Sequence, residues 1–335
     1  MERMKKRVEL PLAEPIYSAY NLQVPGTATL AANPSIRNWY LNQVVMLTCT
    51  RRFLKGFTTP EVSIEDSCWE ANPYLEKWVY EMRFLEGHTG FVIRKLLDAG
   101  YYVCFNGIDD YYVEGKSWYH ERHFSHDGCI CGYDRNEKTY CLYAYDQSWR
   151  CRKFWTPQKS FEAGRRAQFK LGQYGGICGI KPSAEQVKFS CETALERLAE
   201  YLDSDTEKYP EDAEGTVRGI AVHDYVAKYI GRLFDGSVPY ERTDHRIFRV
   251  IWEHKKAMLQ RFERIETAML LGHAVSEAYR TVVREADHCR MLYAAHQLRR
   301  RNDLLPVIGQ KLSELRAREQ RLSEELLRKA ERGAP

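Results

Sequence analysis

The sequence contains no run of about 18 uncharged apolar residues, the minimum for a membrane-spanning helix. Its basic N-terminal run, MERMKKR, is followed by Glu, Pro and Ala instead of the apolar segment of a signal peptide. We therefore expect a cytoplasmic protein that does not contact a membrane.

Strong basic charge and phosphate-binding motifs are also missing. Lys and Arg outnumber Asp and Glu by only four, 50 against 46, in 335 residues. The densest basic cluster, Arg299–Arg301, ends an expected helix, where cations interact favourably with the helix dipole. Neither GxGxxG nor GxxxxGK[ST] occurs. These features predict neither a nucleic-acid partner nor a cofactor.

The ten cysteines are scattered instead of being arranged in a disulfide framework. Thiols stay reduced in the cytoplasm, and a free cysteine behaves as a small apolar residue. We expect Cys104, Cys141 and Cys191, which lie in apolar surroundings, to be core residues.

Composition changes near residue 182 and divides the chain into two expected domains. Residues 1–182 are rich in aromatic residues and glycine, whereas residues 183–335 are rich in Leu, Ala, Glu and Arg. The first part contains two expected helices, at 33–54 and 88–100, and four strand-like runs, at 100–108, 127–134, 138–146 and 150–156. Because turn residues separate two of these runs, 127–146 predicts a hairpin. The first domain is expected to be α+β with an antiparallel sheet.

The second domain, residues 183–335, has helical periodicity almost throughout and predicts an all-α bundle. Its last helix carries one apolar stripe, interrupted by Glu319. The apolar members of the stripe are Ile308, Leu312, Leu315, Leu322 and Leu326. Such a stripe usually packs within its own bundle, but its spacing also allows a coiled-coil homodimer.

The segment HFSHDGCICGYD, residues 123–134, concentrates polar side chains on an expected strand. Alternation places Cys129 and Cys131 on one face with Asp127, and His126 on the other. A zinc site needs about four converging ligands, which this pattern does not supply. Two buried thiols explain the spacing better than a metal site, so we expect no metal.

A catalytic interpretation of the same segment rests on the hairpin. His126 begins one strand and Asp146 ends the next, so the two side chains are expected to meet. The carboxylate would then orient the imidazole as a general base. A His–carboxylate pair formed only for packing is the alternative.

The order of these residues resembles the papain-like cysteine peptidases of the bacteriocin-processing type. It resembles more closely the family typified by the N-terminal domain of butirosin biosynthesis protein H. The likeness rests on His126, on Gly132-Tyr133-Asp134, and on Asp146-Gln147, where the family has Asp-Pro. The helix and strand before the histidine are also similar.

This resemblance implies a papain-like fold and a Cys–His–Asp triad. It implies acyl or aminoacyl transfer, amide formation or hydrolysis in peptide- or aminoglycoside-type natural-product biosynthesis. The implied partners are an acyl or peptidyl carrier protein as donor and a small-molecule amine as acceptor. The implied nucleophile is a cysteine at the N-terminus of the first long helix, where the dipole lowers the thiol pKa.

The expected first helix, NPSIRNWYLNQ, has no cysteine in its opening turn. Cys49 lies at the far end of that helix and is expected in the core. Cys68 is flanked by Glu65, Asp66 and Glu70, which disfavour a thiolate, and Ser35 is more typical of a helix cap.

Three alternatives therefore remain open: Cys68 as nucleophile, Ser35 as nucleophile, or loss of the nucleophile. In the last case the domain would be a catalytically inactive binding or scaffold protein of an assembly line. The aromatic residues before His126, together with His120 and His123, either cover a core or bind a ligand.

Overall fold

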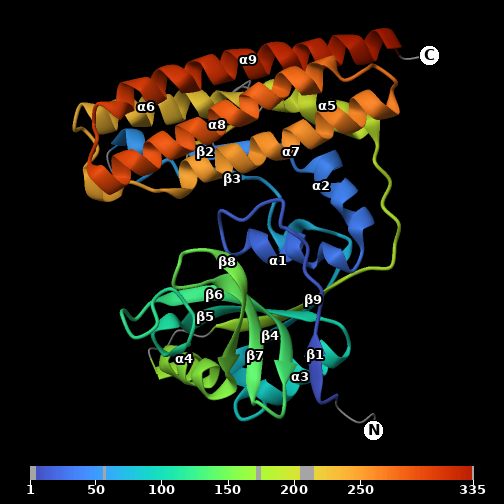
Figure 1. Cartoon of the computed structure of the whole chain (residues 1–335), viewed down its shortest axis with the longest axis vertical. Coiled ribbons are helices and arrows are strands. Elements are labelled where there is room, and N and C mark those ends of the chain that lie inside the picture. The colour runs from blue at the N-terminus through green and yellow to red at the C-terminus, as the bar shows by residue number, and fades with distance from the viewer. Residues whose placement is uncertain (1–4, 56–57, 171–174, 204–214, 334–335) are drawn as a thin grey trace. The chain divides into compact units, whose positions relative to one another are not determined.

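The computed structural model describes residues 5–55, 58–170, 175–203 and 215–333 (Figure 1). The chain forms two compact units, Met1–Ile36 with Cys68–Gln186 and Arg37–Ser67 with Val187–Pro335. Within these ranges the structure is α+β, as expected. The change of unit at Gln186 lies close to the expected boundary at residue 182, but residues 37–67 belong to the second unit.

The first unit is built on an antiparallel sheet, and the four strands expected from the sequence are confirmed. In the described part of the chain the sheet has seven strands in the order β4-β9-β5-β6-β7-β8, with β1 beside β6. They are β1 (Arg7–Glu9), β4 (Leu75–Glu81), β5 (Tyr102–Asp109), β6 (Ser125–Asp134), β7 (Thr139–Tyr145), β8 (Cys151–Pro157) and β9 (Gly176–Pro182). The expected hairpin at 127–146 is formed by β6 and β7.

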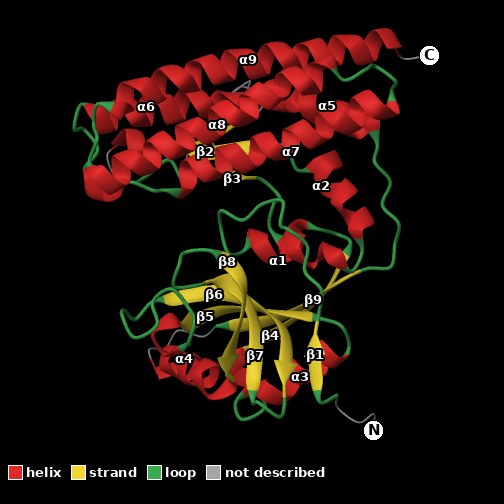
Figure 2. Cartoon of the chain, in the orientation of Figure 1, coloured by secondary structure: helices red, strands yellow, loops and turns green. Residues whose placement is uncertain are grey.

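The two faces of this sheet carry different side chains. In β5, Val103 and Phe105 contribute to a large apolar core, whereas Tyr102 and Cys104 contribute to a smaller cluster. Helices α3 (Thr89–Asp98) and α4 (Gln158–Lys170) supply side chains to the large core, and Figure 2 shows both on one side of the sheet. The period-2 alternation of strand residues thus separates the two faces.

The smaller cluster is rich in cysteine, as the sequence suggested. It contains Cys104, Cys129, Cys131, Cys141 and Cys178, which are all buried. Burial raises the pKa of Cys178 to about 12, and burial is also the largest cause of the raised pKa of Cys104. Cys104 and Cys178 therefore act as apolar residues. Cys191, also expected in the core, is only half-buried at the start of α5.

The expected long helix at 33–54 is wrong. Residues Pro34–Ile36 form a 3-10 turn, α2 covers only Arg37–Gln43, and β2 begins at Leu47 and ends at Thr50. The run VVMLTCT is rich in β-branched residues and joins a small sheet of the second unit. That sheet has the order β10-β2-β3, with β3 at Ser63–Ile64 and β10 at Thr216–Arg218.

The second unit is mainly helical (Figure 2). Besides α2, its helices are α5 (Cys191–Leu202), α6 (Val222–Phe234), α7 (Arg246–Ala268), α8 (Ala274–Arg299) and α9 (Leu304–Gly333). The stripe of α9 is buried within this unit, with Ile308, Leu312 and Glu319 at 0% exposure. The stripe is therefore occupied by packing within the chain, and it is not available as the seam of a dimer.

The remaining helical elements are short. Helix α1 covers Gln23–Ala28 in the first unit. The other 3-10 turns are η1 (Thr29–Ala31), η3 (Arg52–Lys55), η4 (Trp69–Ala71), η5 (Met82–Leu85), η6 (Asp110–Tyr112), η7 (Gly219–Ala221) and η8 (Tyr240–Arg242). Among the described residues, no helix is both long and apolar enough to cross a bilayer.

Candidate functional site

His126 lies beside a carboxylate, but that carboxylate belongs to Asp110. Strands β5 and β6 pair Ile108 with His126, so the residues that follow β5 lie beside the start of β6. The distance from His126 Nδ1 to Asp110 Oδ2 is 2.9 Å. Since an ionised carboxylate only accepts hydrogen bonds, Nδ1 of His126 carries the proton that is donated to Asp110. Asp110 thus fixes the orientation and tautomer of His126.

A lysine completes this cluster. Lys116 Nζ lies 3.2 Å from Asp110 Oδ1 and 3.4 Å from His126 Nδ1, and it donates to the Asp127 carbonyl at 3.1 Å. The side chains of Lys116 and Asp110 are fully buried, whereas that of His126 is 20% exposed. Burial lowers the pKa of Lys116, and the Asp110 carboxylate partly opposes that shift. The lysine neutralises the buried aspartate, and His126 links the pair to solvent.

The expected pair of His126 with Asp146 is not formed. Asp146 Oδ1 accepts from the Ser148 amide at 2.8 Å, from the Ser148 hydroxyl at 2.7 Å and from the Arg150 amide at 3.1 Å. Its Oδ2 accepts from Arg152 Nε. Burial raises the pKa of Asp146, but these hydrogen bonds outweigh burial and keep that pKa below its usual value. Asp146 therefore organises the turn between β7 and β8.

The sheet register explains why Asp146 does not meet His126. Cys129 pairs with Tyr143, and the same register continued for three residues would place Asp146 opposite His126. The β6–β7 pairing ends before that point, and an isolated antiparallel bridge joins the Lys116 backbone to Asp146. The segment that carries Lys116 thus takes the place beside Asp146 that the hairpin argument assigned to His126.

The expected nucleophiles do not reach the imidazole. Within the part of the chain that the structure describes, His126 Nδ1 bonds to Asp110 and lies near Lys116 Nζ, and no thiol or hydroxyl contacts the ring nitrogens. Ser35 Oγ lies 2.7 Å from Asn33 Oδ1 and 3.4 Å from the Glu185 carbonyl. Cys68 is the N-cap residue of η4.

Cys49 is buried in β2 of the second unit, and burial raises its pKa to about 12. The expectation that Cys49 is a core residue is confirmed, although its element is a strand and not the end of a helix. Neither Cys68 nor Ser35, the two side chains considered as nucleophiles, is bonded to His126.

Helix α1, the first α-helix of the first unit, begins close to β6. The Asn21 amide donates to the Asp127 carbonyl at 3.4 Å, and Leu22 is the N-cap residue of α1. The resemblance implies a cysteine at the start of the first long helix, which was expected at 33–54 and is a different segment from α1. The residues at the start of α1 are Asn21, Leu22 and Gln23, which carry neither a thiol nor a hydroxyl.

Aromatic side chains lie next to the His126 cluster. The Phe124 ring meets the His126 ring edge-on at 5.2 Å, Trp118 meets Trp149 at 5.0 Å, and His123 stacks on Tyr111 at 4.3 Å. Phe124 and Trp149 are 38% and 51% exposed. We call the residues Tyr111, Trp118, Phe124 and Trp149 the aromatic surface. At least two of its members therefore face solvent instead of covering a core.

His123 is anchored in a second His–carboxylate pair. Its Nδ1 lies 2.8 Å from Asp109 Oδ2, and Asp109 also accepts from the Tyr111 and Phe124 amides at 3.1 and 3.2 Å. These bonds hold both ends of the loop between β5 and β6. Asp109 thus positions His123, and Asp110 positions His126.

Asp110 and Lys116 were missed by the sequence argument. A signal for Asp110 was present, because IDDYYV places two consecutive carboxylates directly after an apolar strand. The sequence prediction rested on the hairpin at 127–146 alone. The pairing of β5 with β6 would have indicated that one of these two carboxylates is buried.

Neither a metal-binding group among the described residues nor a match to a curated protein was found that would help to interpret this site. No group of three or more His, Cys, Asp or Glu side chains in the described ranges could hold a metal ion. No family model and no curated protein matches this sequence. The site is therefore interpreted from its own geometry.

Proposed function

We propose that the first unit is a papain-like binding domain without a nucleophile of its own, which recognises an acyl or peptidyl carrier protein. The observation that carries this proposal is the environment of His126, whose ring has no thiol or hydroxyl partner among the described residues. A cysteine acyltransferase needs such a partner within hydrogen-bond reach of its base. Asn21, which donates to the Asp127 carbonyl next to His126 in the chain, carries an amide and no thiol.

The aromatic surface supports recognition. Tyr, Trp and Arg are enriched in protein interfaces and carry much of their binding energy. Arg122 lies over the rings of Trp118 and Phe124, at 5.7 and 5.8 Å from the ring centroids. Exposed aromatic rings beside an arginine are typical of such an interface. The family resemblance supplies the carrier protein as the partner.

Thiol labelling tests the absence of a nucleophile. Intact-mass measurements after limited iodoacetamide treatment compare the native protein with His126→Ala, and with His123→Ala as a matched histidine control. If no thiol is activated by His126, all three proteins are modified equally and at the same sites. Faster labelling of one cysteine in the native protein and in His123→Ala, lost in His126→Ala, contradicts the binding proposal.

A direct binding measurement tests the partner. Carrier proteins encoded by neighbouring genes, in their phosphopantetheinylated form, are titrated against the whole protein. Trp149→Ala is expected to weaken binding by about 2 kcal/mol, the size of an interface hot spot. Trp78→Ala removes a similarly exposed tryptophan of β4, 55% exposed, and is expected to leave the affinity unchanged.

A second function is favoured by one feature of the cluster. Asp110 holds Nδ1 of His126, and Nε2 makes no hydrogen bond with a described residue. Such an imidazole can accept a proton directly from an amine bound beside it. The amine nitrogen would attack the thioester carbonyl and form the C–N bond, the C–S bond would break, and His126 would pass the amine proton to the departing carrier thiolate.

This direct transfer needs no enzyme thiol. An assay for amide formation from an acyl-carrier thioester and an amine distinguishes it from binding alone. Turnover that is lost in His126→Gln but kept when Cys68 is changed to alanine favours the direct transfer. No turnover, together with retained carrier binding, favours the binding domain.

A further inference from the structure

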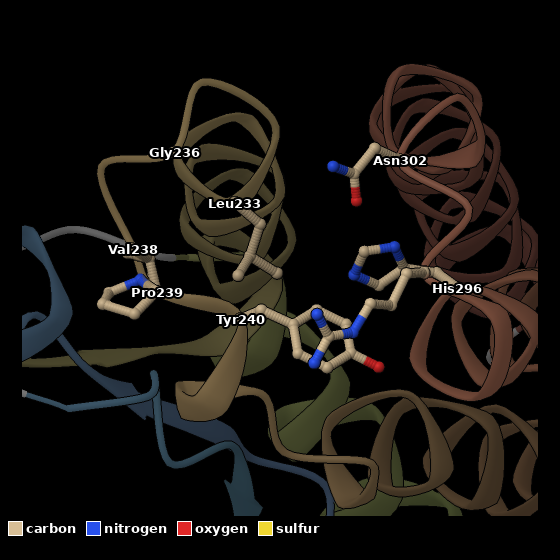
Figure 3. Close-up of a pocket in the computed structure, with 8 residues that line it drawn as sticks. Leu233, Gly236, Val238, Pro239, Tyr240, His296 and Asn302 are labelled. Atoms are coloured by element: carbon tan, nitrogen blue, oxygen red, sulfur yellow. The ribbon is translucent and has the colours of Figure 1, made fainter.

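A cavity of about 290 Å³ lies in the second unit, separate from the His126 cluster. The end of α6, the turn η8 and the junction of α8 with α9 line it, and it is open to solvent on one side (Figure 3). Its lining comprises Leu233, Gly236, Val238, Pro239, Tyr240, His296, Arg300 and Asn302. This volume is near the lower end of the range for small-molecule sites, which begins at about 300 Å³.

His296 is the buried polar group of this cavity. His296 is only 1% exposed, and neither nitrogen of its ring forms a hydrogen bond of normal geometry with a described residue. Burial lowers the pKa of His296, and the nearby Arg301 backbone partly opposes that shift. Figure 3 shows the ring directed from α8 toward Leu233. Since buried polar atoms nearly always have partners, the His296 ring has hydrogen-bonding capacity left for a group that enters the cavity.

Arg300 adds a positive charge beside this imidazole. Its guanidinium lies over the Tyr240 ring at 4.7 Å from the centroid, and the Tyr240 hydroxyl bonds to the Gln297 carbonyl. Among the residues with described side chains, no carboxylate forms an ion pair with Arg300. The next arginine differs, because Arg301 pairs with Asp303 at 2.6 Å. Arg300 therefore presents an unneutralised cation at the cavity, held by an aromatic ring.

The rest of the lining is suited to an apolar group. Leu233 and Val238 are buried and Pro239 lies beside them, on the side of the cavity opposite His296 in Figure 3. The Asn302 amide reaches toward the same space from the start of α9. A ligand that fits this lining has one anionic end and an apolar body.

We infer that this cavity binds a small organic carboxylate, with the carboxylate between Arg300 and His296 and the apolar body against Leu233 and Val238. A planar guanidinium matches a carboxylate in a bidentate geometry, and one cation balances one carboxylate charge. The ring N–H of His296 would donate to the same carboxylate. This inference is independent of the function proposed for the first unit.

The test uses benzoate and hexanoate as carboxylates and benzamide as the uncharged analogue of benzoate. They are titrated into the whole protein while the imidazole ¹H–¹³C signal of His296 is followed by NMR; the spectrum of His296→Phe assigns the signal. We expect a saturable shift with both carboxylates and a much weaker response to benzamide. A signal that does not move up to the solubility limit of benzoate, or that responds equally to benzamide, overturns the inference.

Two arginine variants make the test specific. Arg300→Gln is expected to weaken benzoate binding about tenfold, the loss expected for one charge-assisted hydrogen bond. Arg299→Gln removes the preceding charge of the same helix, outside the cavity lining, and is expected to bind benzoate as the native protein does. Equal weakening in both variants would mean a general charge effect and would also overturn the inference. Circular dichroism confirms that each variant is folded.

Discussion

Lys255 Nζ lies 2.7 Å from Glu319 Oε2, with both side chains fully buried between α7 and α9. The Tyr279 hydroxyl donates to Glu319 Oε1 at 2.5 Å, and the Tyr201 hydroxyl donates to Oε2 at 3.1 Å. Burial raises the pKa of Glu319, but the Lys255 charge, the nearby His223 and the hydrogen bonds from Lys255 and Tyr279 keep it below its usual value. Glu319, which interrupts the apolar stripe of α9, is thus the centre of a polar network in the bundle.

Removing one charge of this pair should be costly. Glu319→Gln leaves the Lys255 ammonium buried without a counter-ion, and we expect a loss of about 3–5 kcal/mol in the free energy of unfolding. Urea unfolding followed by far-ultraviolet circular dichroism measures the loss, because the second unit supplies most of the helical signal. Glu331→Gln, at an exposed position of the same helix, should be neutral.

A double variant separates charge burial from packing. Combining Glu319→Leu with Lys255→Met removes both ions and should recover most of the stability that the single change loses, since apolar pairs often replace buried ion pairs without loss. A double variant as unstable as Glu319→Gln would mean that the tyrosine hydroxyls, and not the ion pair, determine the cost.

Stability of the second unit should fall as the pH decreases from about 6.5. Burial lowers the pKa of His223 to about 3, whereas the unfolded chain has a histidine pKa near 6.5. Between these values the unfolded state binds one more proton, so each pH unit of acidification costs at most about 1.4 kcal/mol per histidine. Burial also lowers the pKa of His254, which adds to the slope in the same direction.

The variant His223→Gln should reduce this slope. Unfolding free energies at pH 7, 6, 5 and 4 would show a smaller loss in His223→Gln than in the native protein. His288, exposed on α8, provides the control His288→Gln, which should keep the native slope. Identical slopes in all three proteins would contradict a neutral, buried His223.

Local sequence patterns predicted the elements of the first unit well. Alternation and turn residues located β5, β6, β7 and β8, because each strand is short and bounded by turn residues. The helix expected at 33–54 failed for a different reason. Residues Thr48–Thr50 pair with Thr216–Arg218, so a partner far along the chain determines their structure. No local pattern reports such a pairing.

The site was predicted only in part, for a similar reason. His126 and a carboxylate do meet, but the hairpin considered was β6–β7, whereas the carboxylate follows β5. The choice depends on where the β6–β7 ladder ends and on the Lys116–Asp146 bridge. These are tertiary features, and the spacing of His126 and Asp146 in the sequence could not reveal them.

The two aspartates should respond differently to the same substitution. Asp110→Asn leaves Lys116 buried and unpaired, and we expect it to destabilise the first unit by about 3–5 kcal/mol. Asp146→Asn should cost less, about 1.5–3 kcal/mol, because Arg152 is 61% exposed and can be solvated. Hydrogen exchange of peptides from β5, β6 and β7 measures both. A larger effect of Asp146→Asn would contradict the role given to Asp110.

Two helical glycines should respond in opposite directions to alanine. Gly164 of α4 packs against the segment that carries the aspartates, and a Cβ there would lie 2.7 Å from the Asp109 carbonyl oxygen and 2.9 Å from Ile108 Cγ2. Gly164→Ala should therefore cost about 1–3 kcal/mol through overpacking. It should also increase the exchange of amides around Asp109, because α4 must move away from β5. Gly231 of α6 has no atom within 4 Å of the same position, so Gly231→Ala should stabilise its helix by about 0.5–1 kcal/mol. If Gly164→Ala were neutral, α4 would not be what holds the Asp109–Asp110 segment against the sheet, and the orientation of His126 would depend on the β5–β6 register alone.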